Sequence, residues 1–88
     1  MKTGKLVFTL GIDEIAEDGA AFERIMEFFH EHKAENWGNM PEEDKIANDE
    51  ALLQGTRVMS SWDLDGKEIW IITEGNREIT TVLLPEEY

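Results

Sequence analysis

The stretch Arg57–Leu84, RVMSSWDLDGKEIWIITEGNREITTVLL, decides the fold, because it has the pattern of three short strands joined by two tight turns. Apolar and polar residues alternate through its first part, which is the period of a half-buried strand. The dipeptide Asp65-Gly66 then supplies the positive φ angles that a two-residue type I′ turn requires. Gly75-Asn76 is a second turn signal, and Pro85, which has no N–H to donate to a ladder, ends the third strand. We therefore predict an antiparallel meander here.

The first turn also fixes the register of the hairpin. The predicted pairs are Leu64 with Lys67, Trp62 with Ile69, Ser60 with Ile71 and Val58 with Thr73. Because paired residues point to the same side of a sheet, Val58, Trp62, Ile69 and Ile71 share one predicted core face. The opposite face carries Met59, Trp70 and Ile72, and it is too apolar for an ordinary solvated face. We therefore hypothesise that this second face is buried only on association, with an isologous homodimer as the simplest solution.

The first part of the chain is predicted to form one strand and two helices. Lys5–Leu10 alternates like a strand, with Leu6, Phe8 and Leu10 on one side, and Gly11 breaks it. A short helix follows, which Gly19 is expected to close. From Ala20 the sequence becomes an amphipathic helix with apolar residues at i, i+3, i+4 and i+7. These residues are Phe22, Ile25, Met26 and Phe29.

A third helix is predicted to begin at Pro41 and to end at Gly55. Its predicted buried stripe is Ile46, Ala47, Ala51 and Leu53. The resulting order, β-α-α-α-β-β-β, indicates one α+β domain over residues 1–88, in two layers, with the C-terminal meander packed on the helices. The pattern does not place the first strand within the sheet.

Composition narrows the class of protein. A chain of 88 residues with 41% hydrophobic content is long enough for a single core. It has no cysteine, which excludes disulfides and thiolate metal sites. No apolar run approaches the roughly 20 residues that a membrane span needs. Since the N-terminus also lacks the apolar region of a signal peptide, we expect a cytoplasmic protein.

The charge is the unusual feature. Twenty acids against eight Lys+Arg give a net charge of -12, which argues against direct binding to nucleic acid. Residues 11–50 hold thirteen of these acids and three Lys+Arg. The acids are either a solvated surface that keeps the protein soluble or a surface shaped to meet a basic partner. The predicted partner-binding residues are Glu23, Glu27, Glu31, Glu42, Glu43, Asp44, Asp49, Met59, Trp70 and Ile72.

Three groups of residues suggest chemistry, and for each the sequence favours a structural role. His30 and His32 point roughly 200° apart on a helix, so they cannot share a metal ion. The acids and amide at Glu43, Asp44, Asn48 and Asp49 suggest Mg²⁺, but hydrogen bonds to nearby backbone or loop are favoured. Ser60-Ser61 has no base partner in the sequence. We predict no catalytic, cofactor or metal site.

The three tryptophans are assigned different surroundings. Trp62 is expected in the core, and Trp37 is expected to cap the helical layer from its loop. Trp70 lies on the less covered side of the sheet, where an interface and a second core are equally compatible with the sequence.

Two strings resemble a small uncharacterised bacterial family that is associated with plasmids, prophages and integrated elements. The first runs from Trp37-Gly38 to Asn48-Asp49 and has the form W-G-x(4)-E-D-K-x-x-N-D. The second, from Ile69 to Tyr88, has the form I-W-I-I-T-E…T-T-x-L-L-P-E-E-Y. The chain departs from the family pattern at Asn39, where the pattern has Asp, and in the aromatic stretch Phe22–Phe29. The resemblance implies a mobile-element origin and no particular activity.

Three hypotheses for function follow. The first is a non-enzymatic interaction protein of a mobile element, for example an anti-defence inhibitor that occupies the DNA-binding groove of a restriction or CRISPR complex. The second is a homo-oligomeric accessory or regulatory protein without DNA mimicry, and the third is a small metal-dependent enzyme. The sequence favours the first. Its partner would be a basic nucleic-acid-binding protein or complex, with no contact to nucleic acid or membrane by this chain itself.

Overall fold

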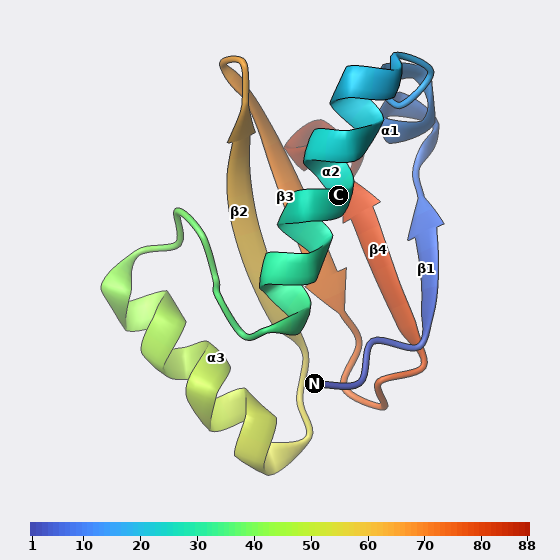
Figure 1. Cartoon of the computed structure of the whole chain (residues 1–88). Coiled ribbons are helices and arrows are strands. Elements are labelled where there is room, and N and C mark those ends of the chain that lie inside the picture. Colours follow the sequence, from blue (N-terminus) through green and yellow to red (C-terminus); the bar gives the residue numbers. More distant parts are fainter.

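The computed structural model describes all 88 residues and confirms the α+β class and the order β-α-α-α-β-β-β (Figure 1). The helices are α1 (Leu10–Ile15), α2 (Gly19–Lys33) and α3 (Glu42–Gln54), and a 3-10 turn, η1 (Pro85–Glu87), follows the last strand. The strands are β1 (Lys5–Phe8), β2 (Val58–Leu64), β3 (Lys67–Thr73) and β4 (Ile79–Leu83). They form one sheet in the order β1-β4-β3-β2.

The hairpin of β2 and β3 has the predicted register. Leu64 pairs with Lys67, and the antiparallel pairing continues to Val58 with Thr73. Both loop residues have positive φ angles, 51° at Asp65 and 87° at Gly66, as a type I′ turn requires. A two-residue loop leaves no freedom in the pairing, which is why local sequence was sufficient here.

The first strand makes the sheet mixed rather than purely antiparallel. β1 pairs in parallel with β4, with Lys5 opposite Ile79 and Phe8 opposite Val82. It therefore lies at one edge of the sheet, and β2 lies at the other edge. Figure 1 shows β1 at the right-hand margin of the molecule, beside β4.

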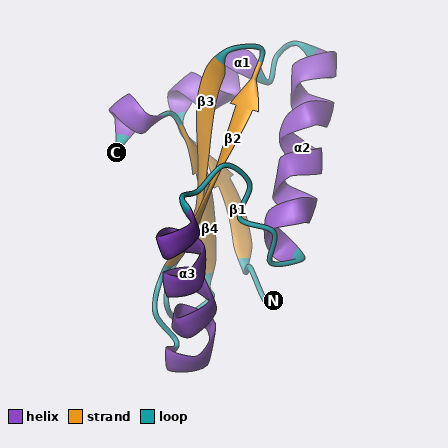
Figure 2. Cartoon of the chain, turned by 90° about the vertical axis from the view of Figure 1, so that its left-hand side faces the viewer, coloured by secondary structure: helices purple, strands orange, loops and turns teal.

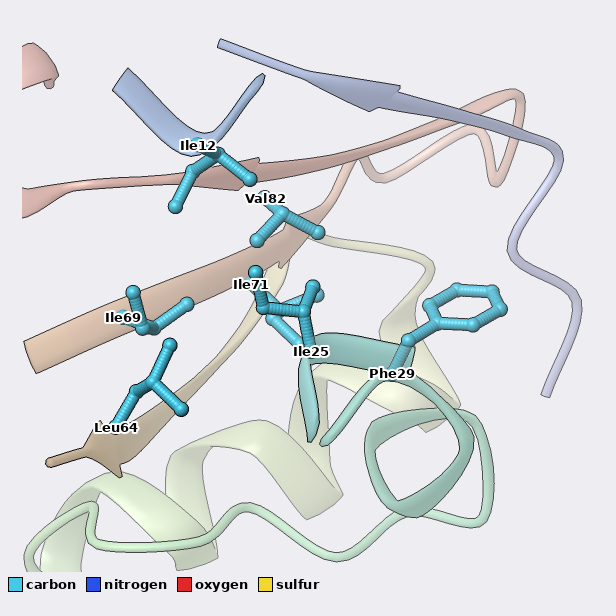
Figure 3. Close-up of a cluster of buried hydrophobic side chains, with 7 residues drawn as sticks. All are labelled: Ile12, Ile25, Phe29, Leu64, Ile69, Ile71 and Val82. Atoms are coloured by element: carbon cyan, nitrogen blue, oxygen red, sulfur yellow. The ribbon is translucent and has the colours of Figure 1, made fainter. Parts of the chain in front are cut away.

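The main core lies between α2 and one face of the sheet. Figure 2 shows α2 on one side of the sheet and η1 on the other, whereas α3 lies against the edge strand β2. Figure 3 shows the buried cluster, to which α1, α2, β2, β3 and β4 all contribute. Its members are Ile12, Ile25, Phe29, Leu64, Ile69, Ile71 and Val82. Trp62, predicted for the core, is half-buried at its margin and stacks on Phe28 with ring centroids 5.2 Å apart.

Two predictions near the N-terminus are wrong. Leu10 does not belong to the first strand. It begins α1, and its side chain is 81% exposed. Gly19 does not close the first helix; it is the first residue of α2, after the N-cap Asp18. The Asp18 side chain accepts a hydrogen bond from the Ala20 N–H at 3.0 Å, which satisfies a donor at the helix start.

The predicted buried stripe of α3 is confirmed for Ala51 only and is wrong for its other three residues. Ile46 and Leu53 are 55% and 90% exposed, and Ala47 is exposed as well, whereas Asn48 and Ala51 are buried. The Asn48 side chain donates to the Met59 carbonyl at 2.7 Å and accepts from the Met59 N–H at 3.2 Å. These two bonds pair Asn48 with the outer edge of β2, so a polar contact decides which face of α3 turns inward.

The loop before α3 covers the same edge at Ser61. The Ser61 N–H donates to the Trp37 carbonyl at 3.3 Å, and the Ser61 carbonyl accepts from the Asn39 N–H at 2.7 Å. Gly38 lies between them with a φ of 66°, and a Cβ there would be 2.2 Å from the Ser61 oxygen. Only glycine allows the loop to approach β2 so closely.

Candidate functional site

The seven predicted partner-binding acids are all exposed. Glu23, Glu27 and Glu31 follow one another at intervals of four residues along one side of α2, a spacing of about 6 Å. Glu42, Glu43 and Asp44 form the first turn of α3, where the helix dipole favours anions. Because α2 covers one face of the sheet whereas α3 lies against the edge strand β2, these residues make two acidic surfaces rather than one.

Very little of the negative charge is neutralised within the chain. The structure contains two ion pairs, one between the N-terminal amine and Glu35 at 3.7 Å and one between Arg24 and Asp65 at 3.9 Å. They involve two of the twenty acids. The field of the other carboxylates therefore extends into solvent on most sides of the molecule.

Asn48 and Asp49, considered for Mg²⁺ from the sequence, have structural partners instead. Asn48 binds the backbone of Met59, and Asp49 accepts a hydrogen bond from the Trp37 indole N–H at 3.1 Å. The favoured prediction, hydrogen bonding to nearby backbone and loop, is confirmed for both. Trp37 is 4% exposed, so Asp49 holds a buried tryptophan against α3, as expected for a residue that caps this layer.

The three apolar residues predicted for partner binding come together at one cleft. It has a volume of about 360 Å³. Met59, Trp70 and Ile72 lie on the sheet face opposite that of Ile69 and Ile71, which pack against α2. Its lining residues are Asn48, Arg57, Val58, Met59, Trp70, Ile72 and Tyr88. Met59 and Trp70 are half-buried, but Ile72 is only 4% exposed. The hypothesis that all three are buried only on association is therefore wrong for Ile72, which the chain itself covers.

The polar groups of the cleft are mostly committed to other partners. The Trp70 indole N–H donates to Glu68 at 2.8 Å, and the Asn48 amide is bonded to β2. Arg57 donates to the Tyr88 hydroxyl at 2.6 Å and lies over its ring, 5.5 Å from the centroid. Since Arg57 forms no ion pair with a carboxylate, the cleft offers an apolar wall with a cation at its rim. Such a surface suits an apolar group that carries a hydrogen-bond acceptor.

His32 lies at the centre of a buried hydrogen-bond chain. Its Nδ1 is 2.7 Å from the Ser60 hydroxyl, and its Nε2 is 2.8 Å from the Thr73 hydroxyl. Thr73 is bonded to Thr80 at 2.7 Å, and Thr80 donates to the Thr3 carbonyl. Because Thr80 donates onward, Thr73 must donate to Thr80 and therefore accept from His32. This sequence of donors places the imidazole proton on Nε2.

The other end of the chain agrees with this assignment. The Trp62 indole N–H donates to the Ser60 oxygen at 2.7 Å, so the Ser60 hydroxyl proton is free to bond to Nδ1 of His32. A second proton on the imidazole would displace the Ser60 proton from its acceptor. Burial, and secondarily the positive charge of Arg77, lowers the pKa of His32 to about 4. His32 is therefore neutral at pH 7.

The expectation that Ser60 has no base partner is wrong, since His32 is within hydrogen-bond distance. Both side chains are 0% exposed, however, so no substrate reaches the hydroxyl. The pair fixes α2 on β2 and β3. His30 is exposed on another side of α2, so the two histidines do not converge. No group of three or more His, Cys, Asp or Glu side chains is arranged to hold a metal ion.

Glu87 is a further structural acid that the sequence did not reveal. Its carboxylate accepts from the Thr9 hydroxyl, from the Gly11 N–H at 2.8 Å and from the Leu84 N–H at 2.9 Å. These hydrogen bonds, that of Thr9 first, lower the pKa of the Glu87 carboxyl below its usual value. The carboxylate thus caps the start of α1 and ties η1 to it.

Comparison with known proteins gives no relative: no family model, curated protein or solved structure matches the chain. No helix is both long enough and apolar enough to cross a membrane.

Proposed function

We propose that this chain is a non-enzymatic protein-interaction module that binds a basic protein partner through the acidic faces of α2 and α3. The observation that carries the proposal is the uncompensated charge, with two ion pairs in a chain of twenty acids. Exposed, unpaired carboxylates attract a positively charged groove at long range and raise the rate of encounter. The regular row Glu23, Glu27 and Glu31 is the centre of the proposed contact on α2.

The partner that suits such a surface is a protein that normally binds nucleic acid. Its groove carries Lys and Arg, and it releases condensed counterions when it meets a chain of negative charges. On a mobile element the module would act as an anti-defence inhibitor, by occupying the DNA-binding groove of a restriction or CRISPR complex. Binding would then be competitive with DNA and would weaken steeply with salt.

The test is to capture a partner from a host extract on the immobilised protein and to measure the affinity of that purified partner. We expect the affinity to fall about tenfold or more between ~50 and ~200 mM salt, as for contacts dominated by phosphate-like charge. Duplex DNA should displace the partner. The triple variant Glu27→Lys, Glu31→Lys, Glu43→Lys should abolish binding while it leaves the fold intact, because exposed helix charges contribute little to stability.

A matched control separates this surface from net charge alone. The variant Glu74→Lys, Glu78→Lys, Glu86→Lys changes the charge by the same amount at exposed positions outside α2 and α3. It should bind nearly as well as the native protein. If the helix variant binds normally, the acidity serves only solubility, and the cleft at Met59 and Trp70 becomes the candidate contact. If both variants lose binding equally, the attraction depends on net charge, and the assignment to α2 and α3 is wrong.

A further inference from the structure

The two edges of the sheet differ in a way that points to a second interaction surface. The edge of β2 is covered at two residues, since Asn48 satisfies the backbone of Met59 and residues 37–39 satisfy that of Ser61. The edge of β1 has no such cover: no strand or bridge of the chain pairs with its outer side. Figure 1 shows β1 at the margin of the molecule. An open strand edge is a template for pairing with another chain.

The hydrogen-bond pattern identifies which groups that edge offers. The Lys5 N–H donates to the Glu78 carbonyl at 2.9 Å, and the Thr9 N–H donates to the Val82 carbonyl at 3.1 Å. Alternate residues of a strand turn their backbone groups to opposite sides, so those of Leu6 and Phe8 point away from β4. Two of the four residues of β1, Leu6 and Phe8, therefore each present an N–H and a carbonyl at the open edge.

An apolar groove runs beside these groups. It has a volume of about 510 Å³. Its lining residues are Leu6, Val7, Phe8, Asp13, Phe22 and Met26. Phe22, from α2, is 43% exposed and contacts Phe8 edge to face, with centroids 6.4 Å apart. A strand added to β1 would bond to the outward backbone groups and would cover this apolar surface as well.

We propose that this edge is an interface between two copies of the chain, formed by antiparallel pairing of β1 with β1. The occupant is identified by charge complementarity along the edge. Lys2 precedes β1 and Lys5 is its first residue, whereas α1, which follows the strand, carries Asp13 and Glu14. Antiparallel pairing about a two-fold axis places the basic end of each copy beside the acidic end of the other. Isologous dimers of this kind are the commonest closed assemblies.

The outward groups also determine the register. Leu6 of one copy lies opposite Phe8 of the other, and the two exchange hydrogen bonds, so Val7 lies opposite Val7 on the axis. Pairing Leu6 with Leu6 would place Phe8 opposite Gly4, whose φ of 63° is not a strand conformation. Pairing Phe8 with Phe8 would place Leu6 opposite Leu10, which belongs to α1. The dimer is then one continuous sheet, with both copies of α2 on the same side.

A single cysteine tests both the dimer and its register, because the native chain has none. In the variant Val7→Cys, the Cα atoms of residue 7 in the two copies would be about 4.5 Å apart, as in a non-hydrogen-bonded antiparallel pair. A disulfide can span this distance. Mild oxidation should convert most of this variant to a cross-linked dimer. The control is Ile79→Cys, at an exposed residue of β4 that shares a face with Lys5 and Val7 but lies one strand inward. It should remain uncross-linked.

Analytical ultracentrifugation of the unmodified chain gives an independent measurement. We expect a concentration-dependent monomer–dimer equilibrium. Val7→Lys should weaken it roughly tenfold or more, since it brings like charges face to face, and Ile79→Lys should leave it unchanged. A native chain that stays monomeric at millimolar concentration would overturn the proposal. So would a dimer in which Val7→Cys does not cross-link, or in which Ile79→Cys cross-links equally well.

Discussion

Acid should destabilise this protein through His32 in a way that can be isolated from every other titrating group. The imidazole is fully buried among Ser60, Thr73 and Trp37, and it is neutral in the folded chain. Burial, with a smaller effect of Arg77, lowers its pKa from 6.5 to about 4. The unfolded chain therefore takes up a proton near pH 6.5 that the folded chain does not accept until about pH 4. Stability must fall as the pH drops through this window.

The magnitude follows from the shift in pKa. A difference of one pKa unit corresponds to about 1.4 kcal/mol, so the change from 6.5 to about 4 is equivalent to about 3 kcal/mol of unfolding free energy. This contribution is present in full above pH 6.5 and is lost by about pH 4. It is a large part of the 5–15 kcal/mol that typically stabilises a domain.

The assay is urea denaturation at several pH values between 7.5 and 4, followed by the fluorescence of the three tryptophans. The control is His32→Gln, which is less stable at pH 7 because hydrogen bonds are lost, but which cannot titrate. Changes that come from the other titrating groups and from the relief of the -12 net charge occur in both proteins. The native protein should therefore lose its stability advantage over the variant by up to about 1.4 kcal/mol per pH unit.

A constant difference between the two proteins across this range would refute the assignment of His32 as a buried neutral imidazole. NMR titration offers a second check. The ring protons of His32 should not shift until the pH approaches 4, whereas a midpoint near 6.5 for His32 would contradict the buried network.

Three further predictions concern the contacts that hold the elements together. Asn48→Ala should cost about 1–3 kcal/mol of unfolding free energy in urea denaturation, because it leaves the Met59 backbone groups without partners; a loss below ~0.5 kcal/mol would show that water replaces the amide. Gly38→Ala should lower the melting temperature more than Gly55→Ala, since both have positive φ but only Gly38 has an oxygen 2.2 Å from the added Cβ; equal losses would mean that the loop moves without cost. Glu87→Gln should lower the melting temperature at pH 7, and the difference from the native protein should shrink as the pH falls through the lowered pKa of Glu87; a difference that persists at low pH would contradict a role for the charge.

The meander could be predicted because its determinants are local. Two residues, Asp65 and Gly66, set the turn, and the turn sets every pair of the β2–β3 hairpin. The place of β1 could not be predicted in this way. Its parallel partner, β4, lies more than 70 residues away, and the pairing depends on how three helices fill the space between them. The sequence of a short apolar strand such as β1 does not indicate whether the strand lies at an edge of the sheet.

The candidate site was predicted in part. The exposure of the acids follows from helical periodicity, and the grouping of Met59, Trp70 and Ile72 follows from the strand register. The contribution of Tyr88 to the cleft depends on a 3-10 turn that folds back over β3, which no pattern in the strands implies. The sequence did contain an indication of the His32 hydrogen-bond network. Ser60 and Thr73 lie on the predicted core face, and small hydroxyls among buried isoleucines require a polar partner from the opposing helix.

The orientation of α3 shows where periodicity fails and why. Its apolar residues predict that Ile46 and Leu53 face inward, and this orientation would bury more hydrocarbon than the observed one. It would also leave the Met59 N–H and carbonyl at the edge of β2 without partners. Two unpaired backbone groups cost about 1–3 kcal/mol each when buried, comparable to burying one or two large aliphatic side chains. Asn48 satisfies both groups at once, and the structure contains no buried side-chain polar atom without a partner. The side-chain amide of Asn48 therefore turns toward β2, and Ile46 and Leu53 are exposed as a consequence.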